Sequence, residues 1–183
     1  MTMKTNQMMF LLPLRSILTC VVALGIGPLP GVSAAEMSDM EKRAKIEAMY
    51  RDYQKDFAEV EDIDPREAMK LLEEGKVVLV DVREEKEQKV SMLPGAITEA
   101  QLLRSPEKYG DRILIGYCTI SYRSGKLAQK LKSMGLSMLN LRGGLLAWVH
   151  DGGKVFDRNG ETRRIHVYGR KWNLGPKDYE AVW

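Results

Sequence analysis

Two continuous apolar runs, residues 77–82 and 113–117, constrain this fold more than any other feature of the sequence. Strands that are covered on both faces of a sheet read as unbroken apolar runs rather than as an alternation. Helical patterns follow both runs, and a third apolar stretch covers residues 136–141. Strands that alternate with helices predict an α/β fold, in which a mostly parallel sheet carries helices on both faces.

The segments outside this core carry their own signals. Ser38 and Glu41 form a capping box for a helix expected over residues 38–57. Asn159-Gly160 predicts a turn between residues 154–156 and 163–168, which would pair as a hairpin, and an aromatic tail follows. The predicted organisation is a signal peptide at 1–35, an N-terminal helix and connector at 36–63, an α/β domain at 64–151, and a C-terminal hairpin and tail at 152–183.

The first 35 residues have the pattern of a secretory signal peptide. Lys4 and Arg15 are their only charges, residues 16–27 are almost wholly apolar, and Ala34 and Ala35 offer small side chains for cleavage. We expect cleavage there and a periplasmic or secreted protein; the alternative is retention as a membrane anchor. A lipoprotein signal at Cys20 is disfavoured, because the apolar run continues past this cysteine.

Cleavage would change both the charge and the cysteine count. Loss of Lys4 and Arg15 lowers the formal net charge from +3 to +1, and no basic cluster remains to predict nucleic-acid binding. Cys118 would then be the only cysteine, so no internal disulfide could form. A single thiol in an exported protein is a candidate for chemistry, although a buried inert cysteine is the usual case.

The loop after residues 113–117 is the candidate active site. A strand that enters a helix through a tight loop gathers unpaired backbone N–H groups at the positive end of the helix dipole. A cysteine in such a loop favours its thiolate form, and Arg123 could bind an oxyanion with two hydrogen bonds. We expect Cys118 to be catalytic and the substrate to contact Thr119, Ile120, Ser121, Tyr122, Arg123 and Ser124.

Four motifs in the same order resemble the rhodanese family of sulfurtransferases over roughly residues 64–151. They are Asp81-Val82-Arg83-Glu84, the Leu93-Pro94-Gly95-Ala96-Ile97 turn, the Cys-x4-Arg loop from Cys118 to Arg123, and Gly143-Gly144 followed by Ala147-Trp148. The resemblance implies a rhodanese-like fold and sulfur transfer through a persulfide on Cys118. It implies a small donor such as thiosulfate, a thiol, cyanide or protein acceptor, and no metal or organic cofactor. From the charge distribution we expect no nucleic-acid partner, and from the N-terminal segment a membrane only if the signal segment is retained.

Some residues depart from the family pattern. Family loops that use thiosulfate well often carry Arg directly after the cysteine and Gly three positions on, where this chain has Thr119 and Ser121. Without that cation, attraction for a dianion is weaker, so we expect thiosulfate to be a poor donor. Met92 and Gln88 stand where the family commonly has a histidine and an aromatic residue.

Two other functions compete with the sulfurtransferase. One is a non-enzymatic binding or sulfur-carrier module. The other is a cysteine phosphatase or arsenate reductase, which needs one more residue between cysteine and arginine.

The remaining polar and aromatic residues are assigned as follows. Asp81 and Arg83 are expected to form a structural ion pair rather than to catalyse. His150 and His166 lie too far apart in sequence for a metal pair. The tail residues His166, Tyr168 and Trp172 could fold over the loop and shape the acceptor site.

Overall fold

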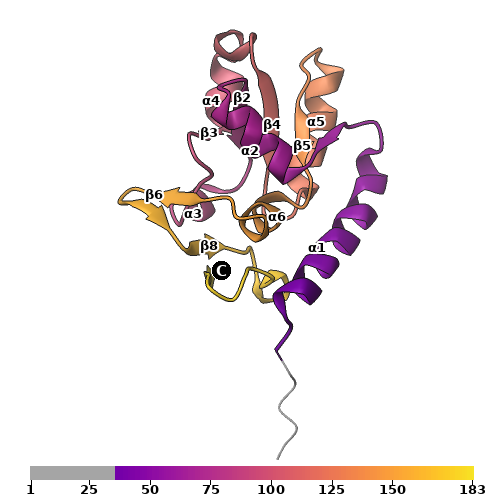
Figure 1. Cartoon of the computed structure of the whole chain (residues 1–183). Helices are drawn as coiled ribbons and strands as arrows, with labels where there is room; N and C mark the ends of the chain where they lie inside the picture. Colours follow the sequence, from indigo (N-terminus) through magenta and orange to yellow (C-terminus); the bar gives the residue numbers. More distant parts are fainter. Residues whose placement is uncertain (1–35) are drawn as a thin grey trace, which may run out of the picture. The chain divides into compact units, whose positions relative to one another are not determined.

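A five-stranded parallel sheet forms the centre of the computed structural model, with strand order β1-β5-β4-β2-β3 (Figure 1). The two apolar runs of the sequence are neighbours in it, as β2 and β4. The predicted fold class is therefore confirmed. The strands are β1 Asp62–Ile63, β2 Val77–Asp81, β3 Ile97–Thr98, β4 Ile113–Tyr117 and β5 Leu139–Leu141.

The structure describes residues 36–183, which form one compact unit. The predicted signal peptide, its cleavage site and Cys20 lie outside the described residues. Within residues 36–183, every helix is too short or too polar to cross a membrane.

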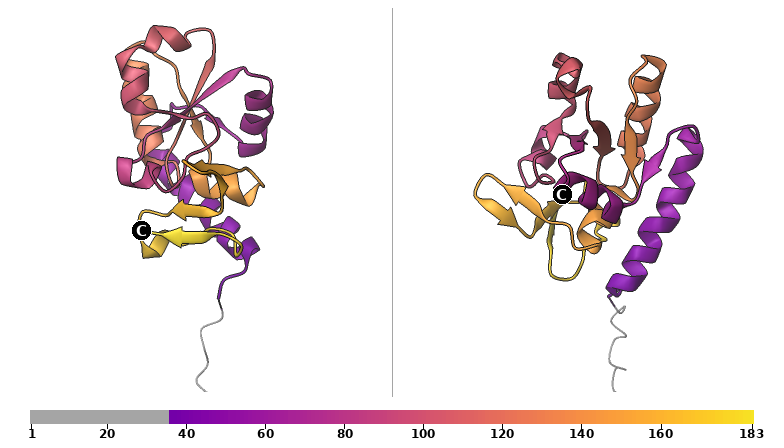
Figure 2. Two further views of the ribbon diagram at one scale, coloured as in Figure 1. Left: turned by 90° about the vertical axis from the view of Figure 1, so that its left-hand side faces the viewer. Right: turned by 45° about the horizontal axis from the view of Figure 1, so that its top comes forward.

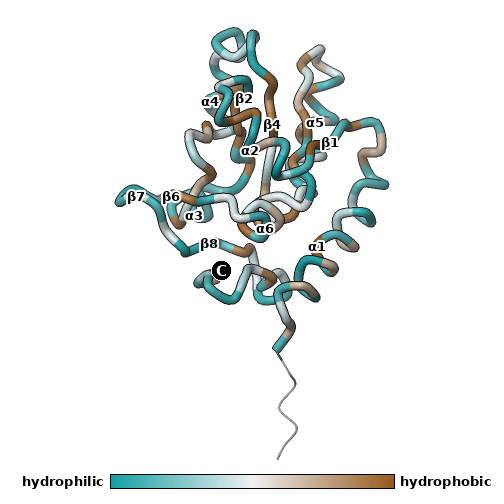
Figure 3. Tube along the Cα trace, in the orientation of Figure 1, coloured by the Kyte–Doolittle hydropathy of each residue, from teal (hydrophilic) through white to brown (hydrophobic). Residues whose placement is uncertain are grey.

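Helices cover both faces of the sheet. They are α1 Asp39–Gln54, α2 Pro65–Glu73, α3 Glu85–Gln88, α4 Glu99–Arg104, α5 Tyr122–Ser133 and α6 Gly144–His150. Along β2, Val77 and Leu79 face the α2 and α6 side, whereas Val78 and Val80 face the α4 and α5 side. Figure 2 (left) shows α2 on one side of the strands and α4 with α5 on the other, and Figure 3 shows that the central strands are the most apolar segments.

Local capping explains where several helices begin. Ser38 and Glu41 form the expected capping box on α1, and Thr98 forms another with Gln101 on α4. The predicted N-terminal helix becomes a tighter 3-10 turn at Lys55–Phe57, which buries Phe57.

The helix α1 lies alongside the domain and contacts both α5 and α6. The Tyr50 hydroxyl donates to Asp62 (2.6 Å), and Lys42 Nζ donates to the carbonyl of Gly175 (2.9 Å). These bonds connect α1 to the start of the sheet and to the C-terminal segment. The N-terminal helix and the tail therefore belong to the same packed unit as the sheet.

The C-terminal segment pairs differently from the expectation. Strand β6 (Val155–Asp157) pairs antiparallel with β7 (Gly160–Thr162), whereas β8 (Arg164–His166) pairs parallel with β9 (Glu180–Val182). The predicted hairpin thus exists, but residues 163–168 are not its second strand. Ile165 is fully buried, and its strand pairs with the tail instead.

Candidate active site

Cys118 directly follows β4, at the carboxyl edge of the sheet where ligand sites of parallel sheets lie. Its side chain is buried, with 2% of the residue exposed. Ser121, three residues on, has a φ of +78° and precedes the first turn of α5. This is the left-handed region, which explains why glycine is common here in the family that the motifs resemble.

The loop is fixed from beneath by α6 and β5. Leu145 N donates to the carbonyl of Cys118 (2.8 Å), and Leu146 N donates to that of Thr119 (3.2 Å). The Ser121 hydroxyl donates to the carbonyl of Leu141 (2.5 Å). These bonds use the loop's carbonyls and leave its N–H groups free to face a ligand.

The Ser124 hydroxyl donates to Asn140 Oδ1 (2.6 Å), and Asn140 Nδ2 donates to the carbonyl of Ser121 (3.2 Å). Both serine side chains are therefore buried anchors of the loop rather than part of the pocket wall. Among the described residues, the backbone N–H groups of residues 119–124 have no hydrogen-bond partner within the chain. Such free donors at a helix N-terminus stabilise an anion.

We expect Gly144→Ala to lower the free energy of unfolding by about 2–4 kcal/mol, because left-handed strain adds to overpacking. Gly144 has a φ of +58°, and an added Cβ would overlap the Cys118 carbonyl and lie 2.9 Å from the Thr119 carbonyl oxygen. Gly75→Ala is the matched control, since Gly75 has a φ of +71° but open space around it. Urea denaturation of both variants would separate the cost of the left-handed backbone from the cost of the steric contact. Equal losses of stability in the two variants would contradict the close approach at Gly144.

Both terminal nitrogens of the Arg123 guanidinium already donate to another side chain of the protein. Its Nη1 and Nη2 donate to the two carboxylate oxygens of Glu87 (2.6 and 2.8 Å), and Nη2 also contacts Thr119 Oγ1 (3.3 Å). Glu87 is fully buried and lies in α3. The two hydrogen bonds that we expected Arg123 to make to a substrate oxyanion are therefore made to Glu87 in this structure.

The pair shifts both titrating groups toward their charged forms. Burial raises the pKa of Glu87, but the hydrogen bonds from Arg123 outweigh it and leave the pKa below the ordinary value of 4.5. Burial lowers the pKa of Arg123, and the bonds to Glu87 with the nearby Cys118 sulfur raise it above its usual range. Arg123 of the loop and Glu87 of α3 therefore form an ion pair with no net charge near Cys118.

A pocket of about 370 Å³ opens above Cys118. Its lining combines the loop with aromatic side chains from outside residues 64–151, namely Tyr53 of α1 and two residues of the C-terminal segment. Of the predicted site residues, the structure brings Cys118, Thr119, Ile120, Tyr122 and Arg123 together here. The full lining is Tyr53, Cys118, Thr119, Ile120, Tyr122, Arg123, Tyr168 and Trp172.

Asp81 and Arg83 form a fully buried ion pair at the end of β2, with Arg83 Nη2 at 2.6 Å from Asp81 Oδ2. The Tyr117 hydroxyl donates to the same carboxylate oxygen (2.6 Å), and neither member of the ion pair lines the pocket. His150 Nε2 contacts the Leu174 carbonyl (2.7 Å), and His166 Nδ1 accepts from Tyr168 N (3.1 Å). Residues 36–183 hold no cluster of three acidic, histidine or cysteine side chains that could bind a metal.

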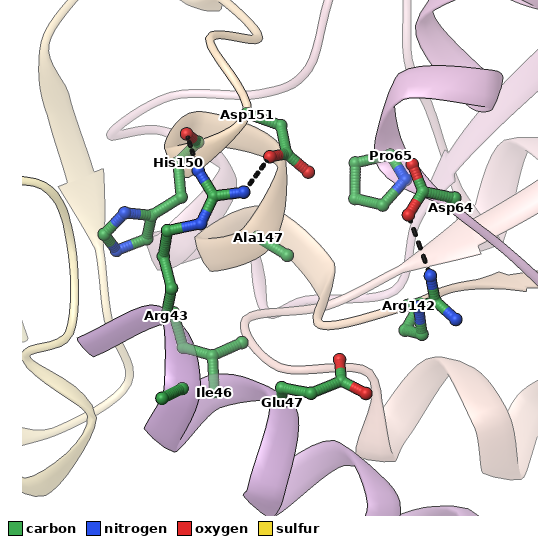
Figure 4. Close-up of a pocket in the computed structure, with 10 residues that line it drawn as sticks. Arg43, Ile46, Glu47, Asp64, Pro65, Arg142, Ala147, His150 and Asp151 are labelled. Carbon is green, nitrogen blue, oxygen red and sulfur yellow. Dashed lines mark hydrogen bonds and ion pairs between the residues drawn. The ribbon is translucent and has the colours of Figure 1, made fainter. Parts of the chain in front are cut away.

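A second pocket, of about 310 Å³, lies between α1, α2 and α6 (Figure 4). Arg43 bonds the carbonyl of His150 (2.7 Å) and the carboxylate of Asp151, and Arg142 donates to Asp64 (2.8 Å). These charges already have partners in the chain. The pocket therefore lies at an interface where paired charged side chains hold α1 against the domain.

Sequence reasoning missed Glu87 and Tyr53. Glu87 reads from sequence as one charge in an exposed helical turn, and its burial depends on β2 and β4 being neighbours. Tyr53 reads as part of the apolar stripe of α1, and its ring packs edge-on against Tyr122 at 5.2 Å. Only the strand order and the course of α1 could have revealed either role.

Residues 64–151 match the family model described as the Rhodanese-like domain. No curated protein matches the sequence. Solved structures that resemble the chain include a Bacillus halodurans protein, 23% identical, which covers 62% of this chain and 87% of its own with a TM-score of 0.49.

A thiosulfate sulfurtransferase from Pseudomonas aeruginosa is 22% identical and covers 70% of this chain but 25% of its own, with a TM-score of 0.48. A Rhodopseudomonas palustris protein of unknown function, described as a possible tyrosine phosphatase, is 24% identical and covers 68% of this chain and 97% of its own, with a TM-score of 0.47.

Proposed function

Because residues 64–151 of this chain are a rhodanese-like domain, as the sequence motifs predicted, we propose that the protein is an exported sulfurtransferase that uses a persulfide on Cys118. One observation supports this most. Cys118 lies at the base of a pocket, in a loop whose backbone N–H groups have no partner within the described residues.

The first step loads the cysteine. The Cys118 thiolate attacks the outer sulfur of a donor such as thiosulfate, and a new S–S bond forms. The bond between that sulfur and the sulfite group breaks, and sulfite leaves with the electron pair. The N–H groups of residues 119–124 would hold the negative charge of the resulting persulfide, as preorganised donors do for other anionic intermediates.

The second step unloads the sulfur. Cyanide or a thiolate attacks the outer sulfur of the persulfide, and the S–S electron pair returns to Cys118. Thiocyanate or an organic persulfide leaves, and the starting thiolate is restored. Neither step needs a metal or an organic cofactor.

The ion pair between Arg123 and Glu87 favours this reaction over phosphatase chemistry. A phosphatase needs its arginine to bind a tetrahedral oxyanion, whereas Arg123 gives both of its terminal nitrogens to Glu87. A sulfane sulfur is a single atom, and free backbone N–H groups are enough to hold it.

The test is intact mass after incubation with thiosulfate, for the full chain and for Cys118→Ser. We expect the native protein to gain one sulfur atom, the variant to gain none, and cyanide to remove the gain. If no donor, including inorganic polysulfide, loads Cys118 in the folded protein, the enzyme proposal is wrong and a binding module remains. Persulfide that forms but resists every small acceptor would favour a carrier that delivers sulfur to a partner protein.

The same measurement tests export. When the full sequence is expressed in a bacterium and the periplasmic fraction is collected, the mass should correspond to a chain that begins near Glu36. A full-length mass in the membrane fraction would instead indicate a retained anchor.

A further inference from the structure

Segments outside residues 64–151 supply three of the aromatic side chains that line the pocket at Cys118. Tyr53 comes from α1, and Tyr168 and Trp172 come from the segment after β8. From the charge and lining of this pocket, and building on the proposed function, we propose that the sulfur acceptor is an uncharged organic thiol with an apolar or aromatic body.

Four aromatic rings line the pocket as two edge-on pairs, which we call the aromatic walls. The ring of Tyr53 packs edge-on against that of Tyr122, with centroids 5.2 Å apart. The rings of Tyr168 and Trp172 pack edge-on with centroids 5.1 Å apart. Together with Ile120, they enclose about 370 Å³, a volume within the usual range for small organic ligands.

The charge of the pocket argues against a small anion as its main ligand. Arg123 is the cation among the lining residues, and Glu87 neutralises it through two hydrogen bonds. Its guanidinium also lies 5.0 Å from the Tyr168 ring. Cyanide would leave most of the volume empty, and a dianion would find no net positive charge to attract it.

The backbone of Tyr168 supplies independent support. Tyr168 has a φ of +65°, in a region that non-glycine residues rarely adopt. The neighbours hold this conformation: Tyr168 N donates to His166 Nδ1 (3.1 Å), and the ring lies between Arg123 and Trp172. Strain of this kind persists where the surroundings impose it, commonly at ligand sites. Here it accompanies a half-exposed ring in the lining of the pocket at Cys118.

The transfer step follows from this placement. The acceptor thiol passes its proton to the outer sulfur of the anionic Cys118 persulfide and attacks that sulfur, so that a bond forms between the acceptor sulfur and the outer sulfur. The bond to Cys118 Sγ breaks, its electron pair stays on Cys118, and the proton leaves with the organic persulfide. The aromatic walls would bind the organic body and orient its sulfur toward Cys118.

The first experiment measures binding without chemistry. Ligand-observed NMR with the Cys118→Ser chain would compare benzyl mercaptan with 2-mercaptoethanol. We expect benzyl mercaptan to bind at least about tenfold more tightly, because only its ring can pack against the walls. Adding Tyr168→Asn should weaken its binding about fivefold to tenfold, since asparagine tolerates the left-handed backbone but lacks the ring. Trp183→Ala, which removes an exposed aromatic residue of the same segment outside the pocket lining, is the matched control and should leave binding unchanged.

The second experiment separates this inference from the proposed function. Persulfide-loaded native chain is mixed with each thiol or with cyanide, and the loss of one sulfur atom is followed by mass. We expect Tyr168→Asn to slow transfer to benzyl mercaptan by a larger factor than it slows transfer to cyanide. Equal binding of the two thiols, or no effect of Tyr168→Asn, would overturn the inference. Selective binding without any persulfide on Cys118 would uphold the pocket and overturn the sulfurtransferase.

Discussion

Replacing Asp81 with asparagine is expected to lower the free energy of unfolding by about 3–5 kcal/mol, because it leaves a buried guanidinium without its carboxylate. Neither side chain of the Asp81–Arg83 pair is exposed to solvent. Asp81 accepts from Arg83 N, Nε and Nη2 and from the hydroxyl of Tyr117. Arg83 also donates to the Ser91 carbonyl (2.6 Å), while its Nη1 has no hydrogen-bond partner among residues 36–183. Most of the hydrogen bonds and charge interactions that offset the burial of the Arg83 guanidinium therefore come from this one carboxylate.

Two further variants distinguish charge burial from other effects of the change. Asp52→Asn makes the same substitution in an exposed pair with Lys55 and should leave stability nearly unchanged. The double variant Asp81→Asn with Arg83→Met removes the unpaired charge and should be more stable than Asp81→Asn alone. Urea denaturation of the four chains gives these differences. If the double variant were the least stable, the ion pair would not be the cause.

Much of the framework could be predicted because its signals are local. The apolar runs of β2 and β4 are continuous in sequence, and the ends of α1 and α4 carry capping boxes within four residues. The position of Cys118 at the end of a central strand follows from the same signals. These features need no knowledge of which segments meet in space.

The parts that could not be predicted depend on contacts between distant segments. Strands β1 and β3 have two residues each, too few to show a period, and exist because β5 and β2 offer them an edge. The pairing of β8 with β9 joins residues 164–166 to the last residues of the chain. Glu87 and Arg123 are 36 positions apart in sequence, so neither residue alone indicates that a buried carboxylate neutralises the arginine of the loop.

Glu87 also gives the second large effect. Glu87→Gln keeps the size of the side chain but removes the charge that Arg123 depends on, and we expect it to lower the free energy of unfolding by about 3 kcal/mol at neutral pH. This is the lower end of the range for breaking a buried pair, because the Arg123 side chain is 29% exposed. Glu85→Gln, in an exposed pair on the same helix, is the matched control and should have little effect.

The pH dependence identifies the charge as the cause. The pKa of Glu87 in the folded chain lies below the ordinary value of 4.5, chiefly because the Arg123 hydrogen bonds outweigh burial. A carboxylate with a lowered folded-state pKa stabilises the chain fully above the unfolded value, and this contribution disappears as the pH falls through the folded value. Native and Glu87→Gln chains should therefore differ most near neutral pH and converge as the pH falls below 4.5 and through the lowered pKa of Glu87. Urea denaturation across this range measures the convergence, and a difference that stayed constant with pH would mean that packing, rather than the Glu87 charge, holds Arg123 in the loop.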